Sequence, residues 1–294
     1  IQDLTAGDIE GAQLQYGAPI NAAPSENAPP AVDDRIILLD GDQTLDGLGG
    51  IDTAVVGVQQ NSVTVSIDKD DKIIIIDRAS KGGTDTLSNI ELLEFTDATL
   101  DMNAFSSLTQ LSNDQFKALG EMYVAYFNRA PDAGGLFFWA DTLAEGSTLD
   151  QIAERFFDQD ETRAIYIDPS NTDAFVTAVY ANVLGRTPDQ GGFTFWKARL
   201  AEGDVTQGAF VLKIIEGAKN AGGPNDAIYL SDKADLAIYY AAIKGLSNGA
   251  DGRQVMATFG DQATSNKIGA KTAIDGHYEN AISGTDGEFL FNVV

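Results

Sequence analysis

The sequence predicts an α+β multidomain protein, in which a small β module precedes an all-α helical domain. Three observations support this fold class. Apolar and polar residues alternate with period two within 35–105, helical spacing of apolar residues runs from 111 almost to the C-terminus, and an internal repeat recurs at an offset of 57 residues. With 294 residues and 44% hydrophobic content, the chain is large enough for two packed units.

The N-terminal 34 residues divide into a predicted helix and a predicted linker. In 1–17, Thr5 suits an N-cap, Ile9 and Tyr16 share one helical stripe, and Gly17 suits the position after the last turn. Residues 18–34 hold four of the eight prolines. Proline fixes φ and lacks an N–H group, so this segment is expected to be extended and semi-rigid.

The same first segment carries a short motif, DIxGxQxxYG, at positions 8–17. It resembles the closing helix of metzincin zinc proteases of the serralysin and matrixin kind, and departs from that pattern at Ala12 and Gln15. The resemblance implies that Ile1 lies just inside the end of a protease domain whose zinc-binding helix is missing from this stretch. An ordinary capped helix explains the same residues equally well. No signal peptide begins at Ile1, so a fragment is expected.

The β module is expected at 35–105. Val63, Val65 and Ile67 alternate with polar residues, an acidic turn follows, and four consecutive isoleucines begin at Ile73. This pattern predicts a β-hairpin. Further strands are predicted within 53–58 and 90–95.

Two glycine- and aspartate-rich stretches flank this hairpin: LDGLGGIDTAVV at 45–56 and GGTDTLSNIELLEFTD at 82–97. The first resembles a degenerate RTX nonapeptide, GGxGxDxUx, of haemolysin-type calcium-binding proteins, and the second resembles the segment that follows RTX arrays. The resemblance implies calcium as cofactor, because Ca²⁺ takes six to eight oxygen ligands. The candidate ligands are Asp46, Asp52 and Asp85, with Asp40 and Asp42 behind them. The alternative is that these aspartates form turns.

Charge and composition restrict the partners. The net charge is −25, and residues 1–105 hold 19 acidic against 5 basic residues. Such a chain is expected to attract cations and to bind no nucleic acid. No apolar run approaches the length of a membrane span, so no membrane insertion is expected. With no cysteine and a single histidine, His277, the chain offers neither thiolate nor two-imidazole zinc sites.

The internal repeat reads YVAYFNRAPDAGGLFFW at 123–139 and YANVLGRTPDQGGFTFW at 180–196. Each copy predicts a helix, a turn through Pro-Asp-x-Gly-Gly and a second helix. The aspartate is expected to cap the second helix in preference to binding metal, the arginine to pair with a carboxylate, and the Phe and Trp side chains to enter the core. The residues that define this structural motif are Arg129, Asp132, Trp139, Arg186, Asp189 and Trp196.

The repeat resembles the DUF4214 family over 111–282. This resemblance implies a secreted structural or adhesive role and brings no catalytic residues. The helical domain is expected at 106–294, and its tail, 289–294 after Asp286 and Glu288, resembles an uncleaved type I secretion signal. The alternative is a final strand or docking segment. No GxSxG motif accompanies His277, so no catalysis is expected from it.

Together these features predict a secreted, calcium-stabilised, non-catalytic region of a larger type I-exported protein, at the surface or outside of a Gram-negative bacterium. Its role would be structural, in surface assembly, and its parent would be a metalloendopeptidase if the metzincin resemblance holds. The expected partners are calcium ions, other copies of the chain or a cell-surface glycan. The alternatives are a self-assembling subunit of a surface layer or filament, and a glycan-directed enzyme or adhesin.

Overall fold

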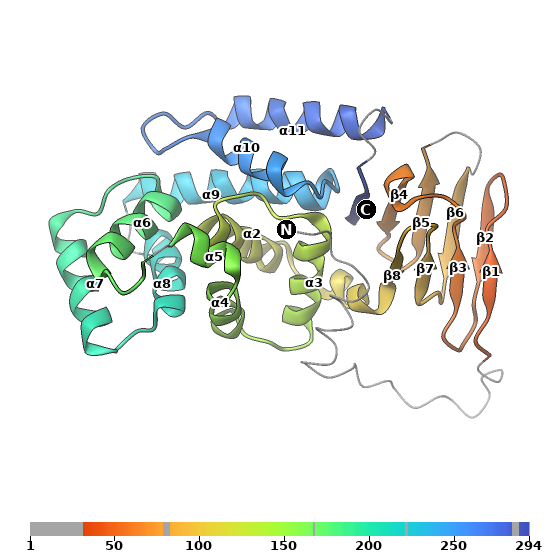
Figure 1. The fold of residues 1–294 in the computed structure, drawn as a ribbon, viewed down its shortest axis with the longest axis horizontal. Coiled ribbons are helices and arrows are strands. Elements are labelled where there is room, and N and C mark those ends of the chain that lie inside the picture. Colours follow the sequence, from red (N-terminus) through yellow and green to blue (C-terminus); the bar gives the residue numbers. More distant parts are fainter. Residues whose placement is uncertain (1–31, 79–82, 167, 221–222, 284–287, 294) are drawn as a thin grey trace.

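The computed structural model describes residues 32–78, 83–166, 168–220, 223–283 and 288–293. The predicted helix at 1–17, with its metzincin resemblance, and nearly all of the predicted linker lie outside these ranges. The described chain combines sheets and helices, as the predicted α+β class requires (Figure 1). The β module lies at one end of an elongated molecule, and the second motif copy lies at the other (Figure 1).

The β module consists of two sheets, and the chain passes from one to the other as it proceeds. Because β1, β3 and β7 are parallel neighbours in the first sheet while β2 and β6 are parallel neighbours in the second, the chain winds in stacked coils. The first sheet has the order β1 (Arg35–Ile37), β3 (Thr53–Val55), β7 (Leu92–Glu94) and β8 (Thr99–Asp101); the second has the order β2 (Gln43–Asp46), β6 (Thr84–Ser88), β5 (Ile73–Asp77), β4 (Val63–Ile67) and β9 (Leu290–Val293).

The predicted hairpin is confirmed, since β4 and β5 are antiparallel with Val65 opposite Ile75. The alternation of side chains between the two faces of each strand explains which of them are buried. Val63 and Val65 of β4, and Ile73 and Ile75 of β5, lie in the core. The consecutive isoleucines are therefore not all buried, because successive side chains of a strand point to opposite faces.

The C-terminal strand joins the two parts of the protein. β9 pairs in parallel with β4, more than two hundred residues earlier in the chain. Leu290 and Phe291 have no exposed surface, and the Phe291 ring meets Phe105 at 4.8 Å and Phe137 at 5.0 Å, edge to face. The alternative interpretation of the C-terminal tail, as a final strand, is thus confirmed for these residues.

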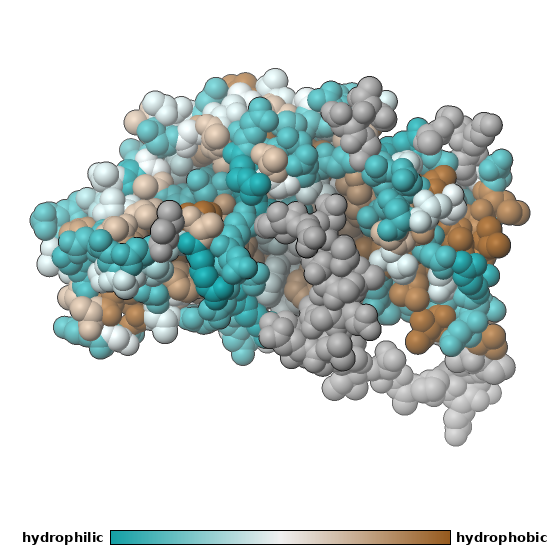
Figure 2. Space-filling view, in the orientation of Figure 1, coloured by the Kyte–Doolittle hydropathy of each residue, from teal (hydrophilic) through white to brown (hydrophobic). Residues whose placement is uncertain are grey.

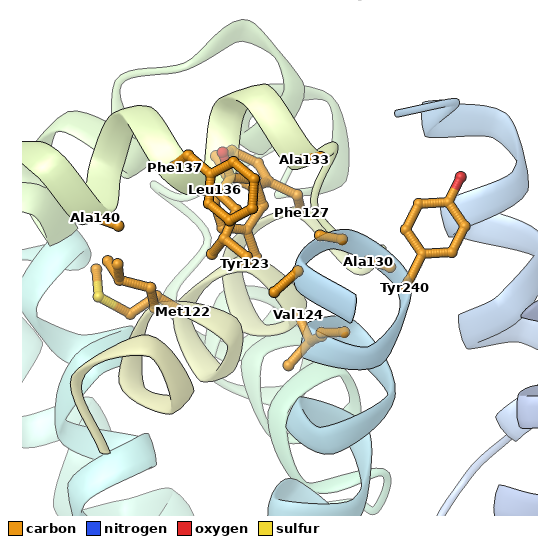
Figure 3. Close-up of a cluster of buried hydrophobic side chains, with 14 of the residues drawn as sticks. Met122, Tyr123, Val124, Phe127, Ala130, Ala133, Leu136, Phe137, Ala140 and Tyr240 are labelled. Carbon is orange, nitrogen blue, oxygen red and sulfur yellow. The ribbon is translucent and has the colours of Figure 1, made fainter. Parts of the chain in front are cut away.

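The helical part begins after two 3₁₀ turns and encloses a π-helical turn. Its first two helices, α2 and α3, face each other across a cluster of buried side chains that also includes Tyr240 (Figure 3). One continuous apolar core runs from this cluster into the β module. The helices are α2 (Asn113–Phe127), α3 (Ala133–Ala144), α4 (Leu149–Phe157), α5 (Asp160–Ile165), α6 (Thr172–Leu184), α7 (Gln190–Glu202), α8 (Gln207–Asn220), α9 (Pro224–Ile238), α10 (Gly249–Phe259) and α11 (Lys267–Ile282); the shorter turns are η1 (Gln60–Ser62), η2 (Met102–Phe105), η3 (Leu108–Gln110) and the π turn η4 (Tyr239–Ile243).

Within the described ranges, no helix is long and apolar enough to cross a membrane.

Removing the Phe291 ring should destabilise the protein strongly. We expect Phe291→Ala to lower the free energy of unfolding by about 3–5 kcal/mol, because it leaves a cavity between two aromatic rings. Phe195→Ala is the matched control: this ring is 50% exposed, and its loss should cost less than about 1 kcal/mol. Urea denaturation measures both variants, and equal losses would contradict the assigned role of β9.

Candidate functional site

Arg129 fixes the turn of the first motif copy. Its Nε donates to Glu161 Oε1 at 2.9 Å, and its Nη1 donates to the Ala130 carbonyl at 3.0 Å and to Asp132 Oδ2 at 3.3 Å. The guanidinium lies 5.6 Å from the centre of the Tyr123 ring. Only 4% of this side chain is exposed. The arginine thus links three parts of the chain, and the predicted arginine–carboxylate pair is confirmed.

Arg186 repeats this arrangement in the second copy. Its Nε and Nη2 donate to the two carboxylate oxygens of Asp226, each at 2.7 Å, and its Nη1 donates to the Thr187 carbonyl at 3.0 Å. The guanidinium again lies over the motif tyrosine, here Tyr180, at 5.4 Å. These bonds from Arg186 lower the pKa of Asp226. The partner comes from α9 in this copy and from α5 in the first.

The two motif aspartates are helix caps. Asp132 Oδ1 accepts a hydrogen bond from the Gly135 amide at 2.6 Å, and Asp189 Oδ1 accepts one from the Gly192 amide at 2.9 Å. A Cβ atom on either glycine would lie 2.6 Å from the hydroxyl of the tyrosine in the same copy. The second glycine of each Gly-Gly pair therefore allows this tyrosine to approach. The predicted capping role of both aspartates is confirmed.

The motif aromatic residues are less buried than predicted. Trp139 packs against Phe156 and Trp196 against Phe210, with ring centres 5.0 and 5.1 Å apart, and both indoles are partly exposed. Phe195 is half exposed, so its predicted core position is wrong. The reason is that α7 packs mainly on α6 and contains no buried residue.

A buried lysine lies near the C-terminal ends of α2 and α6. Lys233 Nζ donates to the Asn182 carbonyl at 2.7 Å and to Asn128 Oδ1 at 3.0 Å, and no carboxylate of the described chain pairs with it. Burial lowers the pKa of Lys233 to about 7. Carbonyl groups at helix ends partly compensate the ammonium charge. No sequence signal marks this residue, because a lysine within a helical pattern is usually solvated.

In the β module, a carboxylate–amide ladder joins successive coils. Asp34, Asp52 and Glu91 occupy equivalent positions just before β1, β3 and β7. The Asp34 amide donates to Asp52 Oδ1 at 2.7 Å, and the Asp52 amide donates to Glu91 Oε2, also at 2.7 Å. Asp52 and Glu91 thus each accept a backbone hydrogen bond from the preceding coil.

Asp46 and Asp52 both lie beside Gly47. Asp46 Oδ1 accepts hydrogen bonds from Asn89 Nδ2 at 2.7 Å and the Leu48 amide at 3.0 Å, and the bond from Asn89 contributes most to lowering the pKa of Asp46. Asp52 is fully buried, and its Oδ2 has no hydrogen-bond donor among the described residues. A Cβ on Gly47 would lie 2.7 Å from this oxygen and 2.1 Å from the Asn89 carbonyl oxygen. The two oxygens therefore flank the same glycine.

Asp42 and Asp85 form a second pair. Asp85 Oδ1 accepts a hydrogen bond from the Gln43 amide at 3.0 Å, and Asp42 Oδ1 accepts one from the Thr84 amide at 2.8 Å. Burial raises the pKa of Asp85, and the negative charges of Asp42 and Asp77 raise it further. This end of β2 therefore concentrates negative charge.

The predicted calcium ligands do not all converge. Asp46 and Asp42 lie at opposite ends of β2, and Asp40 is exposed in the turn before it. Over the ranges that the structure describes, no group of three or more His, Cys, Asp or Glu side chains could hold a metal ion. The buried Asp52 oxygen without a donor is the feature that suits an added cation. Calcium binding stays a prediction.

The single histidine lies between two helices of the helical part. His277 Nδ1, on α11, is 3.3 Å from Asp251 Oδ2, on α10. Glu288 nearby accepts hydrogen bonds from the Ser247 and Asn248 amides, at 2.6 and 2.7 Å. The histidine thus has a carboxylate partner, and nothing in this geometry assigns it a reaction.

Comparison with known families found one match. Residues 153–222 match a family described as a domain of unknown function, DUF4214. This range runs from α4 to α8 and contains the second motif copy. The predicted resemblance is therefore confirmed for these residues. Neither the comparison with curated proteins nor that with solved structures found a match.

Arg129 should matter more than its counterpart in the second copy. We expect Arg129→Ala to lower the free energy of unfolding by about 3–5 kcal/mol, because it removes the buried cation that Asp132 and Glu161 share and leaves Glu161 with only the half-exposed Arg253. Arg186→Ala should cost less, about 1–3 kcal/mol, since 31% of that side chain is exposed. Arg163→Ala is the control, with an exposed ion pair and a loss of less than about 1 kcal/mol. Chemical denaturation ranks the three, and a reversed order would refute this account.

Lys233 should make stability depend on pH. An unfolded lysine titrates near pH 10.4, whereas the folded pKa is about 7. Between these values the unfolded chain binds a proton that the folded chain does not, so wild-type stability should rise with pH from about 7 to about 10. We expect Lys233→Met to remove much of this rise.

Denaturant titrations at several pH values measure this effect. Lys69→Met is the control, because its ammonium group is exposed, and it should retain the wild-type slope. A Lys233→Met protein with an unchanged slope would show that another group titrates.

Proposed function

We propose that this chain is a non-catalytic structural region of a larger protein that a Gram-negative bacterium secretes by type I export. In this proposal the region serves surface assembly and is stabilised by calcium. The bonds of the repeated motif support the structural part. The arginines and aspartates of both copies are bonded to the protein itself, where they fix helix turns.

The observation that carries the assembly role is the asymmetry of the β module. At one end of its sheets, β9 contacts α3 and η4, and the helical part continues from there (Figure 1). At the other end, β1 and β2 are edge strands. Several exposed apolar side chains lie at this open end, as Figure 2 shows. Unpaired strand edges with apolar side chains favour association with another chain.

The tail that was predicted to be a secretion signal supports export before folding. Leu290 and Phe291 are fully buried in the folded protein, as part of β9. An exporter that recognises these residues must therefore bind them before β9 pairs with β4. We propose that export precedes folding and that the metalloendopeptidase activity of the parent protein, where it has one, resides in another domain.

Calcium is proposed to act at the turn that contains Asp52. The acidic excess of residues 1–105 raises the electrostatic cost of folding the β module, and a bound cation would offset this cost. The buried Asp52 oxygen without a donor supports this location. Calcium would then stabilise the folded state and leave the unfolded chain unaffected.

Calcium should raise the melting temperature of the wild-type protein relative to EGTA. Asp52→Asn should reduce this increment, because it removes a charge while keeping an acceptor for the Asp34 amide. In EGTA the variant should be at least as stable as wild type, since it removes a buried negative charge whose Oδ2 has no donor among the described residues. Differential scanning calorimetry measures these effects.

Asp160→Asn is the control, because that carboxylate is fully exposed on the helical part, and it should keep the wild-type increment. Equal melting temperatures in calcium and EGTA for the wild-type protein would refute the calcium part of the proposal.

A self-assembling subunit of a surface layer or filament is the second candidate function, which the edge strands β1 and β2 permit, although the negative charge there disfavours contact between identical copies. Sedimentation with and without calcium separates it from a monomeric appendage. The glycan-directed enzyme or adhesin gains no specific support from the described geometry.

A further inference from the structure

Among the described strands, none pairs with the outer side of the first coil of the β module, residues 32–51. We name it the edge coil; it contains β1 and β2. Thr53 donates to the Asp34 carbonyl, and Leu38 donates to the Val55 carbonyl. In a parallel ladder alternate residues bond the same neighbour. The backbone groups of Arg35 and Ile37 therefore face outward, away from β3.

The carboxylate–amide ladder ends with an acceptor on this side. Asp52 and Glu91 each accept the amide of the equivalent residue one coil earlier. Asp34 is the next member of this series, and no described residue donates to its carboxylate. A strand placed beside β1 would bring an amide to this position. The edge coil thus offers backbone groups and a carboxylate in the register that the inner coils already use.

The side chains of the edge coil combine apolar surface with negative charge. Five large apolar residues are each between 55% and 67% exposed, and the coil contains five aspartates against one basic residue. Figure 2 shows hydrophobic side chains at this end of the molecule. The exposed apolar residues are Val32, Ile37, Leu39, Leu48 and Ile51, and the aspartates are Asp33, Asp34, Asp40, Asp42 and Asp46.

We propose that the edge coil binds an extended segment of another protein, in which apolar residues alternate with lysine or arginine, and that this segment adds to the sheet beside β1. The inference rests on the proposed assembly role and identifies the partner by its chemistry. Backbone hydrogen bonds supply the pairing, the apolar residues cover Ile37 and Leu39, and the basic residues meet the aspartates.

A second copy of the chain fits this surface less well. The far edge of the second sheet, at β9, is covered by α3 and η4, so a symmetric contact between two copies would bring their edge coils together. Such a contact would place five aspartates opposite five others, in molecules that each carry a net charge of −25. Like charges at an interface disfavour association. Charge complementarity therefore selects a basic partner.

The test uses the full chain and synthetic peptides of about eight residues, the length of a typical strand. A peptide of alternating valine and lysine should bind, and its affinity should fall with rising salt. A valine–glutamate peptide should not bind. A valine–lysine peptide with N-methyl groups on alternate residues should also lose binding, since it cannot pair as a strand. Fluorescence anisotropy measures each affinity, in calcium and in EGTA.

Two matched variants locate the binding surface. Ile37→Lys should weaken binding of the valine–lysine peptide at least about tenfold, equivalent to about 1.4 kcal/mol. Ile268→Lys places the same charge at an exposed isoleucine of α11 and should bind as wild type does. Circular dichroism confirms that both variants are folded.

Several outcomes would overturn the inference. Equal affinity for the lysine and glutamate peptides would remove the charge argument, and unchanged binding by Ile37→Lys would place the site elsewhere. A dimer that Ile37→Lys dissociates would make a second copy the occupant. A protein that calcium stabilises but that binds no peptide would refute this inference alone, whereas peptide binding without calcium stabilisation would refute only the calcium part of the proposed function.

Discussion

The packing of Phe291 between Phe105 and Phe137 is the contact that holds the β module and the helical part together. It joins a side chain near the C-terminus, one at the end of the β module and one in the first motif copy. β9 also completes the sheet beside β4, so the β module lacks a strand until the helical part has folded. The entropic cost of closing so long a loop grows only slowly with its length. The two parts therefore share one core, and we expect them to unfold together.

The two motif copies show how one local arrangement can serve in different surroundings. Each arginine bonds the carbonyl of the following residue, lies over a tyrosine and pairs with a carboxylate of another helix. What differs is the surroundings. The first copy packs against the β module through α3, whereas α7 of the second copy contains no buried residue. The motif is therefore stable without being enclosed, because its bonds are made within the copy and to a single neighbouring helix.

Sequence reasoning succeeded where the determining interactions are local. The hairpin of β4 and β5, the helix caps Asp132 and Asp189, and the arginine–carboxylate pairs followed from period, spacing and chemistry. It failed where the burial or the partner of a residue depends on a segment that is far away in the sequence. Nothing near Phe195 shows that α7 lacks a covering neighbour, and nothing near Lys233 shows that three helices meet around it. The choice of Glu161 and Asp226 among 44 acidic residues likewise depends on tertiary packing.

The aspartates of the β module show a further limit of sequence reasoning. A glycine- and aspartate-rich turn predicts oxygen ligands, but the same carboxylates can accept backbone amides from a neighbouring coil. In the fold, Asp42, Asp52 and Asp85 do so, whereas Asp46 accepts the Leu48 amide of its own turn. The two uses require the same residue types at the same spacing, so the sequence pattern cannot separate them.

The place of β9 in the sheet also sets an order of events during biosynthesis. A ribosome adds roughly 5–20 residues per second, so β4 leaves it many seconds before β9 is made. During that interval the edge of β4 that β9 will cover stays open, and the rings of Phe105 and Phe137 lack their shared neighbour. The nascent chain therefore cannot reach its final packing before β9 has left the ribosome. Delayed closure of this kind keeps a polypeptide unfolded for longer, as the proposed export before folding would require.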